Sequence, residues 1–158
     1  MTKCIVTIIL LVFIGCKDFG EDVRPVPPDV PVNVLLAAPE TVVVDGGTLA
    51  LSTYMWRSFM PIVPPNGSSL IALVYIGMTD STKVPSSTSA DAVWIVNGQT
   101  VWKSFLADAN QPPTNQLCKV ARDGPRWDNP VDVIVRVFGS RGDSHLLRAP
   151  HQTIGKVY

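Results

Sequence analysis

The chain reads AVWIVNGQTVWK at residues 92–103, and this stretch decides the fold. An apolar segment stands on each side of Asn97-Gly98, and Asn-Gly between apolar segments is the strongest short-range signal for a β-hairpin. A two-residue turn at this dipeptide pairs Val96 with Gln99. We therefore expect two antiparallel strands joined by a tight turn.

The expected register assigns each hairpin tryptophan to a face of the sheet. Side chains alternate between faces along a strand, which places Trp94 and Trp102 on opposite faces. The face of Trp102 also holds Val93 and Ile95, and we assign these three residues to the core. The other face carries Lys103 as well as Trp94. Trp94 is therefore predicted to be at least partly exposed.

Short strands follow one another from about Val32 onward. Residues 41–44 and 48–53 flank an Asp-Gly-Gly turn, and residues 70–78 form a β-rich segment between turn formers, which suits a central strand. Residues 131–137 place four valines inward and Asp, Ile and Arg outward, and a turn then leads to a return strand at 144–149. No stretch of more than ten residues keeps a helical apolar period free of proline and glycine, so long helices are not expected.

These strands predict an all-β fold, an antiparallel β-sandwich over residues 32–158. The arrangement resembles the immunoglobulin-like domains of bacterial surface proteins. The chain lacks the paired cysteines of antibody domains, so the resemblance is one of architecture.

The first fifteen residues have the pattern of a secretion signal. Lys3 supplies a positive charge, and residues 4–14 form an apolar run of eleven. A transmembrane helix needs roughly 20 apolar residues to cross about 30 Å of hydrocarbon, so this run is too short to span a bilayer. We therefore interpret residues 1–15 as a cleavable signal peptide.

The end of this segment, Phe13-Ile14-Gly15-Cys16, resembles the lipobox of bacterial lipoproteins. The resemblance implies cleavage before Cys16, acylation of that cysteine and attachment to a membrane. Phe13 and Ile14 depart from the pattern, because leucine and a small residue are usual there. An ordinary signal peptide or an uncleaved anchor is the alternative. An aspartate directly after the acylated cysteine favours retention in the inner membrane. This chain has Lys17 at that position, so we expect the outer membrane or the cell surface.

Residues 16–31 are expected to form a proline-rich tether. Four prolines fall within residues 25–31, and proline-rich segments favour extended polyproline II at about 3.1 Å per residue. Such a tether would hold the domain up to about 45 Å from the lipid.

Composition excludes several classes of function. The 13 basic residues equal the 13 acidic ones, so nothing predicts nucleic-acid binding. Cys118 would be the one cysteine besides Cys16 in the mature chain, and we interpret it as a small buried residue. His145 and His151 are too few for a metal site. No cofactor, metal site or catalytic set is predicted, and the protein is expected not to be an enzyme.

The candidate ligand-binding residues are aromatic or basic. Trp94 is one because the register directs it outward, and Trp127 and Arg126 lie in a turn-rich loop at residues 123–130. Arg141-Gly142-Asp143 matches the integrin-recognition tripeptide, but a tight turn favours these residues in any case. We expect a membrane-tethered binding or structural module for an envelope protein or polysaccharide. An accessory subunit of an envelope assembly or, less favoured, a small hydrolase is the alternative.

Overall fold

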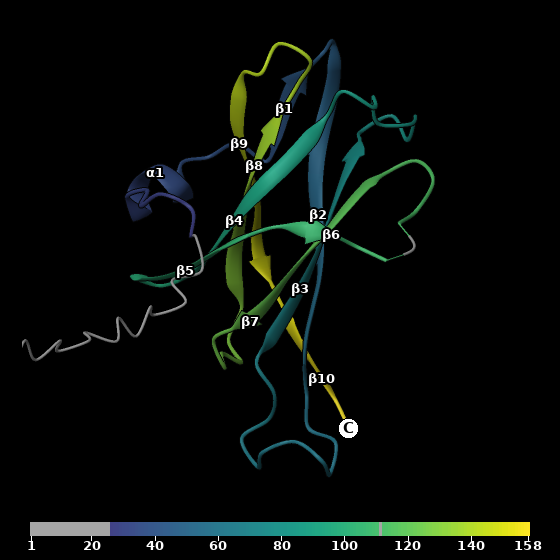
Figure 1. Cartoon of the computed structure of the whole chain (residues 1–158). Coiled ribbons are helices and arrows are strands. Elements are labelled where there is room, and N and C mark those ends of the chain that lie inside the picture. Colours follow the sequence, from purple (N-terminus) through teal and green to yellow (C-terminus); the bar gives the residue numbers. More distant parts are fainter. Residues whose placement is uncertain (1–25, 111) are drawn as a thin grey trace, which may run out of the picture.

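The structure is a computed structural model that describes residues 26–110 and 112–158. Two β-sheets pack face to face, and the described residues contain one short helix (Figure 1). The predicted all-β antiparallel sandwich is therefore confirmed. The described ranges contain no helix that is long and apolar enough to cross a bilayer.

The first sheet, sheet A, has the strand order β1-β2-β3-β7-β6, and β10 lies beside the second half of β2. The β10–β2 pair is parallel, whereas the other strand pairs of sheet A are antiparallel. The chain passes from β9 of the second sheet into β10 at residue 153. The strands of sheet A are β1 (Thr41–Val44), β2 (Gly47–Ser58), β3 (Leu70–Met78), β6 (Ala107–Asp108), β7 (Leu117–Gly124) and β10 (Ile154–Val157). The segment expected to form a central strand is β3, between β2 and β7.

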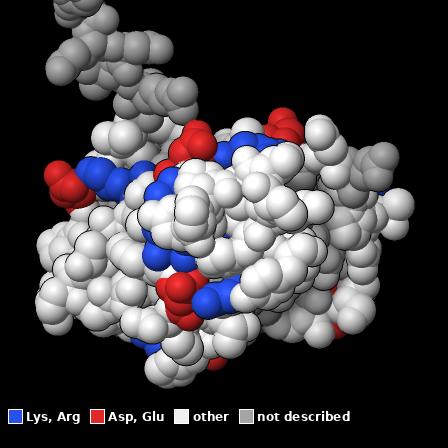
Figure 2. Space-filling view, turned by 90° about the horizontal axis from the view of Figure 1, so that it is seen from below, with Lys and Arg blue, Asp and Glu red and all other residues white. Residues whose placement is uncertain are grey.

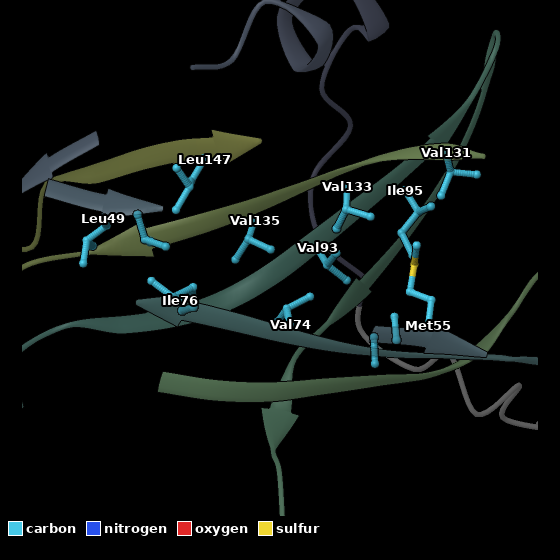
Figure 3. Packing of buried hydrophobic residues seen from close by; sticks show 14 of the residues in the cluster. Leu49, Met55, Val74, Ile76, Val93, Ile95, Val131, Val133, Val135 and Leu147 are labelled. Atoms are coloured by element: carbon cyan, nitrogen blue, oxygen red, sulfur yellow. The ribbon is translucent and has the colours of Figure 1, made fainter. Parts of the chain in front are cut away.

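The second sheet, sheet B, has the order β5-β4-β8-β9. Its strands are β4 (Ser89–Asn97), β5 (Thr100–Phe105), β8 (Val131–Phe138) and β9 (Ser144–Gln152). The inner faces of the two sheets form the main core (Figure 3). Aliphatic side chains dominate this core, and its fully buried members include Leu49, Val74, Ile76, Val93, Ile95, Val133, Val135 and Leu147. The four valines of β8 point inward as predicted.

The β4–β5 hairpin forms, but its register differs from the prediction. Asn97 pairs with Thr100, so the turn residues are Gly98 and Gln99. Gly98 has φ +60°, which fits a glycine at the first central position of a type II′ turn. Trp102 pairs with Ile95, two positions from the expected partner. Side chains alternate between the two faces of a strand, so a register shift of two residues leaves each side chain on its predicted face. The assignment of Trp102 to the core side therefore holds.

Trp94 is buried, which corrects the prediction that it is exposed. Its side chain is 1% exposed in a second core on the outer face of sheet B. Helix α1 (Val32–Leu36) covers this face, where a strand had been expected. The physical reason is that β4 carries apolar residues on both faces, which favours burial on both faces. Leu35 and Ala38 complete the apolar contact.

Part of the expected tether lies on the domain. Pro27 is buried, the Pro28 carbonyl accepts a hydrogen bond from Trp94 Nε1 at 3.2 Å, and Asp29 forms an ion pair with Lys103. We call residues 26–38 the N-terminal layer. The described end of the proline-rich segment is therefore attached to sheet B. The predicted signal peptide, Cys16 and the rest of the tether lie outside the described residues.

Candidate functional site

Sheet A has an outer face rich in aromatic and aliphatic side chains. Residues directly opposite one another on paired strands share a face. The register places Tyr54 beside Leu73 and Leu73 beside Val120, while Trp56 lies beside Ile71. We call this surface the aromatic face, and it consists of Ser52, Tyr54, Trp56, Ile71, Leu73, Tyr75, Cys118 and Val120.

Two aromatic rings lie side by side on the aromatic face. Tyr54 and Trp56 are two residues apart on β2, so both point outward. Their ring centroids are 5.2 Å apart, and the ring planes are tilted by 34°. Tyr54 is 58% exposed, whereas Trp56 and the neighbouring Leu73 are half-buried. The pair offers a ligand a shallow apolar platform rather than a pocket.

One outer face of the sandwich is covered by another part of the chain, and the other outer face is more open. The N-terminal layer packs over sheet B, where it encloses Trp94 and Ile134. In the part of the chain that the structure describes, Tyr54 on the opposite side stays open to solvent. Contiguous apolar surface that remains exposed on a folded domain marks sites of interaction.

Two polar groups of the aromatic face, the Tyr75 hydroxyl and the Cys118 thiol, have raised pKa values. Tyr75 and Cys118 lie opposite each other on β3 and β7. Burial raises the pKa of the Tyr75 hydroxyl, and it also raises the pKa of the Cys118 thiol. Both groups are therefore protonated at neutral pH. Cys118 is buried and unpaired, as predicted, and a buried protonated thiol is a poor nucleophile.

The structure does not bring the three predicted ligand-binding residues together. Trp94 lies beneath the N-terminal layer, on the far side of the sandwich from the aromatic face. Trp127 is half-buried against the main core, and the Arg126 side chain is exposed in the loop before β8. No common surface unites them, whereas Tyr54 and Trp56 form the pair that sequence reasoning missed. Their two-residue spacing is the signal that indicates a shared face.

A buried arginine ties the end of β2 to two loops. Arg57 is 2% exposed, and its Nε donates to the Ser68 carbonyl at 3.0 Å. Its Nη1 donates to Asp128 Oδ1 at 2.6 Å and to the Arg126 carbonyl at 3.3 Å, while Nη2 donates to the Asn66 carbonyl. Its partners come from residues 59–69 and from the loop before β8. This side chain therefore has a structural role.

The C-terminal strand joins the same cluster. Lys156 Nζ lies 3.5 Å from Asp128 Oδ2 and 5.3 Å from the centroid of the Phe59 ring. Phe59 in turn stacks on Tyr158, with ring centroids 5.6 Å apart. The loop after β2 and the end of β10 are therefore held against each other.

The hollows at the ends of the sandwich hold structural contacts. One of about 510 Å³ is lined by Asp45, Ser140 and His145 among others. Asp45 accepts hydrogen bonds from the Ser140 backbone and hydroxyl and from Ser87, and these bonds lower its pKa. His151 lines a different hollow. Within residues 26–110 and 112–158, no three metal-ligating side chains converge.

Comparisons with protein-family models, with curated proteins and with solved structures found no match. Function therefore has to be inferred from the surfaces of the molecule. On the aromatic face, Tyr54 is exposed and lies beside the half-buried Trp56, so the candidate binding surface is centred on these two rings. The two rings could bind a ligand by apolar contact and ring stacking.

Proposed function

We propose that this protein is a lipid-anchored, non-enzymatic binding module of a bacterial cell envelope, and that it binds its ligand on the aromatic face. The observation that carries the proposal is the exposed Tyr54 ring beside Trp56 on an apolar sheet face. The opposite face of the sandwich is covered by the chain's own N-terminal layer. An open aromatic face on such a domain is best explained by a partner.

The anchor is proposed to be a lipid on Cys16. The supporting pattern is the charged and apolar leader followed by Gly15-Cys16. Val26, the first described residue, follows Cys16 by ten residues, so a short segment would join the lipid to the domain. Lys17 favours the outer membrane or the cell surface as the location.

The proposed ligand is a neutral envelope polysaccharide. Flat aromatic rings stack on the apolar faces of sugar rings, and Tyr54 and Trp56 offer two adjacent rings. Tyr54, Trp56 and the neighbouring Leu73 are uncharged, which suits stacking against an uncharged sugar ring. A polysaccharide needs no deep pocket, because it lies across a surface.

The second candidate function is an accessory subunit that docks an envelope protein on the same face. Leu73 and Ile71 favour this alternative, because they lie among the aromatic side chains. Aromatic side chains are enriched in protein interfaces, and the centre of an interface is more apolar than its rim. A small hydrolase has less support, since the buried Cys118 lies on sheet A and both histidines border sheet B.

Truncation of either platform ring is expected to weaken polysaccharide binding. Tyr54→Ala and Trp56→Ala should each lower affinity at least about tenfold, which corresponds to about 1.4 kcal/mol, because central aromatic residues dominate binding energy. The matched control is Phe105→Ala, which removes an exposed ring from β5 in sheet B. The measurement is cosedimentation of the purified protein with insoluble cell-wall polysaccharide.

The control should sediment like the unchanged protein. Equal binding by all three variants would contradict the assignment of the ligand to the aromatic face. Binding of an envelope protein, lost in the two platform variants, would favour the accessory-subunit alternative.

A further inference from the structure

The loop between β2 and β3, residues 59–69, is apolar and projects from one end of the sandwich. It lies at the bottom of Figure 1, beside the C-terminus. The sequence contains no charged residue from Phe59 to Leu70. Ile62 is 94% exposed, and Met60 is exposed as well. We call this segment the apolar loop. Apolar surface that is exposed to water costs about 25 cal/mol of free energy per Å² relative to buried surface. Removal from water would therefore stabilise the tip of the apolar loop.

Internal hydrogen bonds hold the apolar loop in this shape. Val63 N donates to the Met60 carbonyl at 3.0 Å, and Gly67 N donates to the Pro64 carbonyl at 2.8 Å. The buried Arg57 binds two further carbonyls at the base of the loop. Three prolines restrict the backbone of the tip. The loop therefore presents Ile62 to solvent instead of folding it onto the sheet.

The base of the apolar loop combines aromatic and basic side chains. Tyr158 is 81% exposed and stacks on Phe59, and Lys156 lies over the same ring while its ammonium group pairs with Asp128. Figure 2 views the molecule from this end and shows a largely uncharged surface with a few basic groups beside acidic ones. Exposed aromatic rings and a lysine beside an apolar tip are typical of segments at the membrane–water interface.

We propose that the apolar loop is a second membrane contact, in which Ile62 and Met60 enter the interfacial region of the bilayer. This inference rests on the proposed function in placing the protein at a membrane. The ten residues from Cys16 to Val26 span at most about 35 Å, which is close to the diameter of a small domain. An acylated Cys16 would therefore keep the domain within about one diameter of the bilayer.

Two contacts would fix the orientation of the domain on the membrane. The apolar loop joins the C-terminal end of β2 to the start of β3. With the loop in the bilayer, these strands run away from the membrane surface. The aromatic face, which β2 and β3 carry, then stands upright and is reached from the side. A polysaccharide that lies along the membrane could contact it there.

The test places an environment-sensitive fluorophore on the apolar loop. Ile62→Cys is labelled in the full chain isolated from membranes and reconstituted into phosphatidylethanolamine–phosphatidylglycerol vesicles. Val43→Cys is the matched control, because Val43 is an exposed apolar residue on β1, away from the loop. The unsubstituted protein, treated with the same fluorophore, measures how much label reacts with the native cysteines. Both substituted side chains are exposed, so the fold should tolerate the changes.

We expect lipid-borne quenchers to quench the label at Ile62→Cys several-fold more than the label at Val43→Cys, and aqueous iodide to do the reverse. Equal access of iodide to both labels would overturn the proposal. Protection from iodide without quenching by lipid would also overturn it, and would indicate that the loop docks on a protein. The intact mass of the same preparation shows separately whether Cys16 is acylated, so failure of the lipid anchor can be distinguished from failure of the loop proposal.

Discussion

Replacing Arg57 with methionine is expected to lower the free energy of unfolding by about 3 kcal/mol. Methionine fills much of the space but donates no hydrogen bond, so the carbonyls of Asn66 and Ser68 lose their partner. Asp128 loses its ion pair at 2.6 Å. Removal of one partner from a buried charged network is costly because the remaining polar groups stay partly desolvated.

The measurement is urea unfolding followed by circular dichroism. Lys103→Met is the control, since Lys103 pairs with an almost fully exposed Asp29 at the surface. A solvent-screened pair contributes little, so this variant should unfold close to the unchanged protein. Equal losses in the two variants would show that Arg57 does not organise the loops as described.

Replacing Trp94 with alanine is expected to cost about 4 kcal/mol of folding free energy. The indole fills the space between sheet B and the N-terminal layer, and its removal leaves a cavity. The hydrogen bond from Nε1 to the Pro28 carbonyl is lost as well. Trp94→Phe keeps most of the packing, so it should lose less, with about 1 kcal/mol attributable to the hydrogen bond.

Unfolding midpoints of the two variants measure this difference, and limited proteolysis reports on the N-terminal layer. Cleavage within residues 26–38 should become faster in Trp94→Ala and change little in Trp94→Phe. Stability close to that of the unchanged protein in Trp94→Ala would contradict the burial of this residue.

Local sequence patterns predict most of the sandwich. Asn97-Gly98 between apolar segments indicates the β4–β5 hairpin, although the turn forms one residue later because glycine fits the position that requires positive φ. Alternating valines indicate the inward face of β8. These features depend on neighbouring residues, so they can be read without knowledge of the fold.

The missed features depend on contacts between distant segments. Trp94 is covered by residues about 60 positions earlier, which lie in and around α1 and at the end of the proline-rich segment predicted to be a tether. Helix α1 has five residues, too few to show a helical period. The alternation that runs through 48–53 continues to Ser58, which makes Tyr54 and Trp56 outward and Arg57 inward. The partners of Arg57 lie in loops whose path no local pattern encodes.

Anchoring of the protein through Cys16 is tested most directly by its intact mass in a membrane fraction. We predict a chain that starts at Cys16 and carries added acyl mass. Cys16→Ala should lose this mass, whereas Cys118→Ala should keep it, because Cys118 is buried in the domain. An unmodified chain, either soluble or still carrying residues 1–15, would contradict the lipid anchor and the membrane location that depends on it.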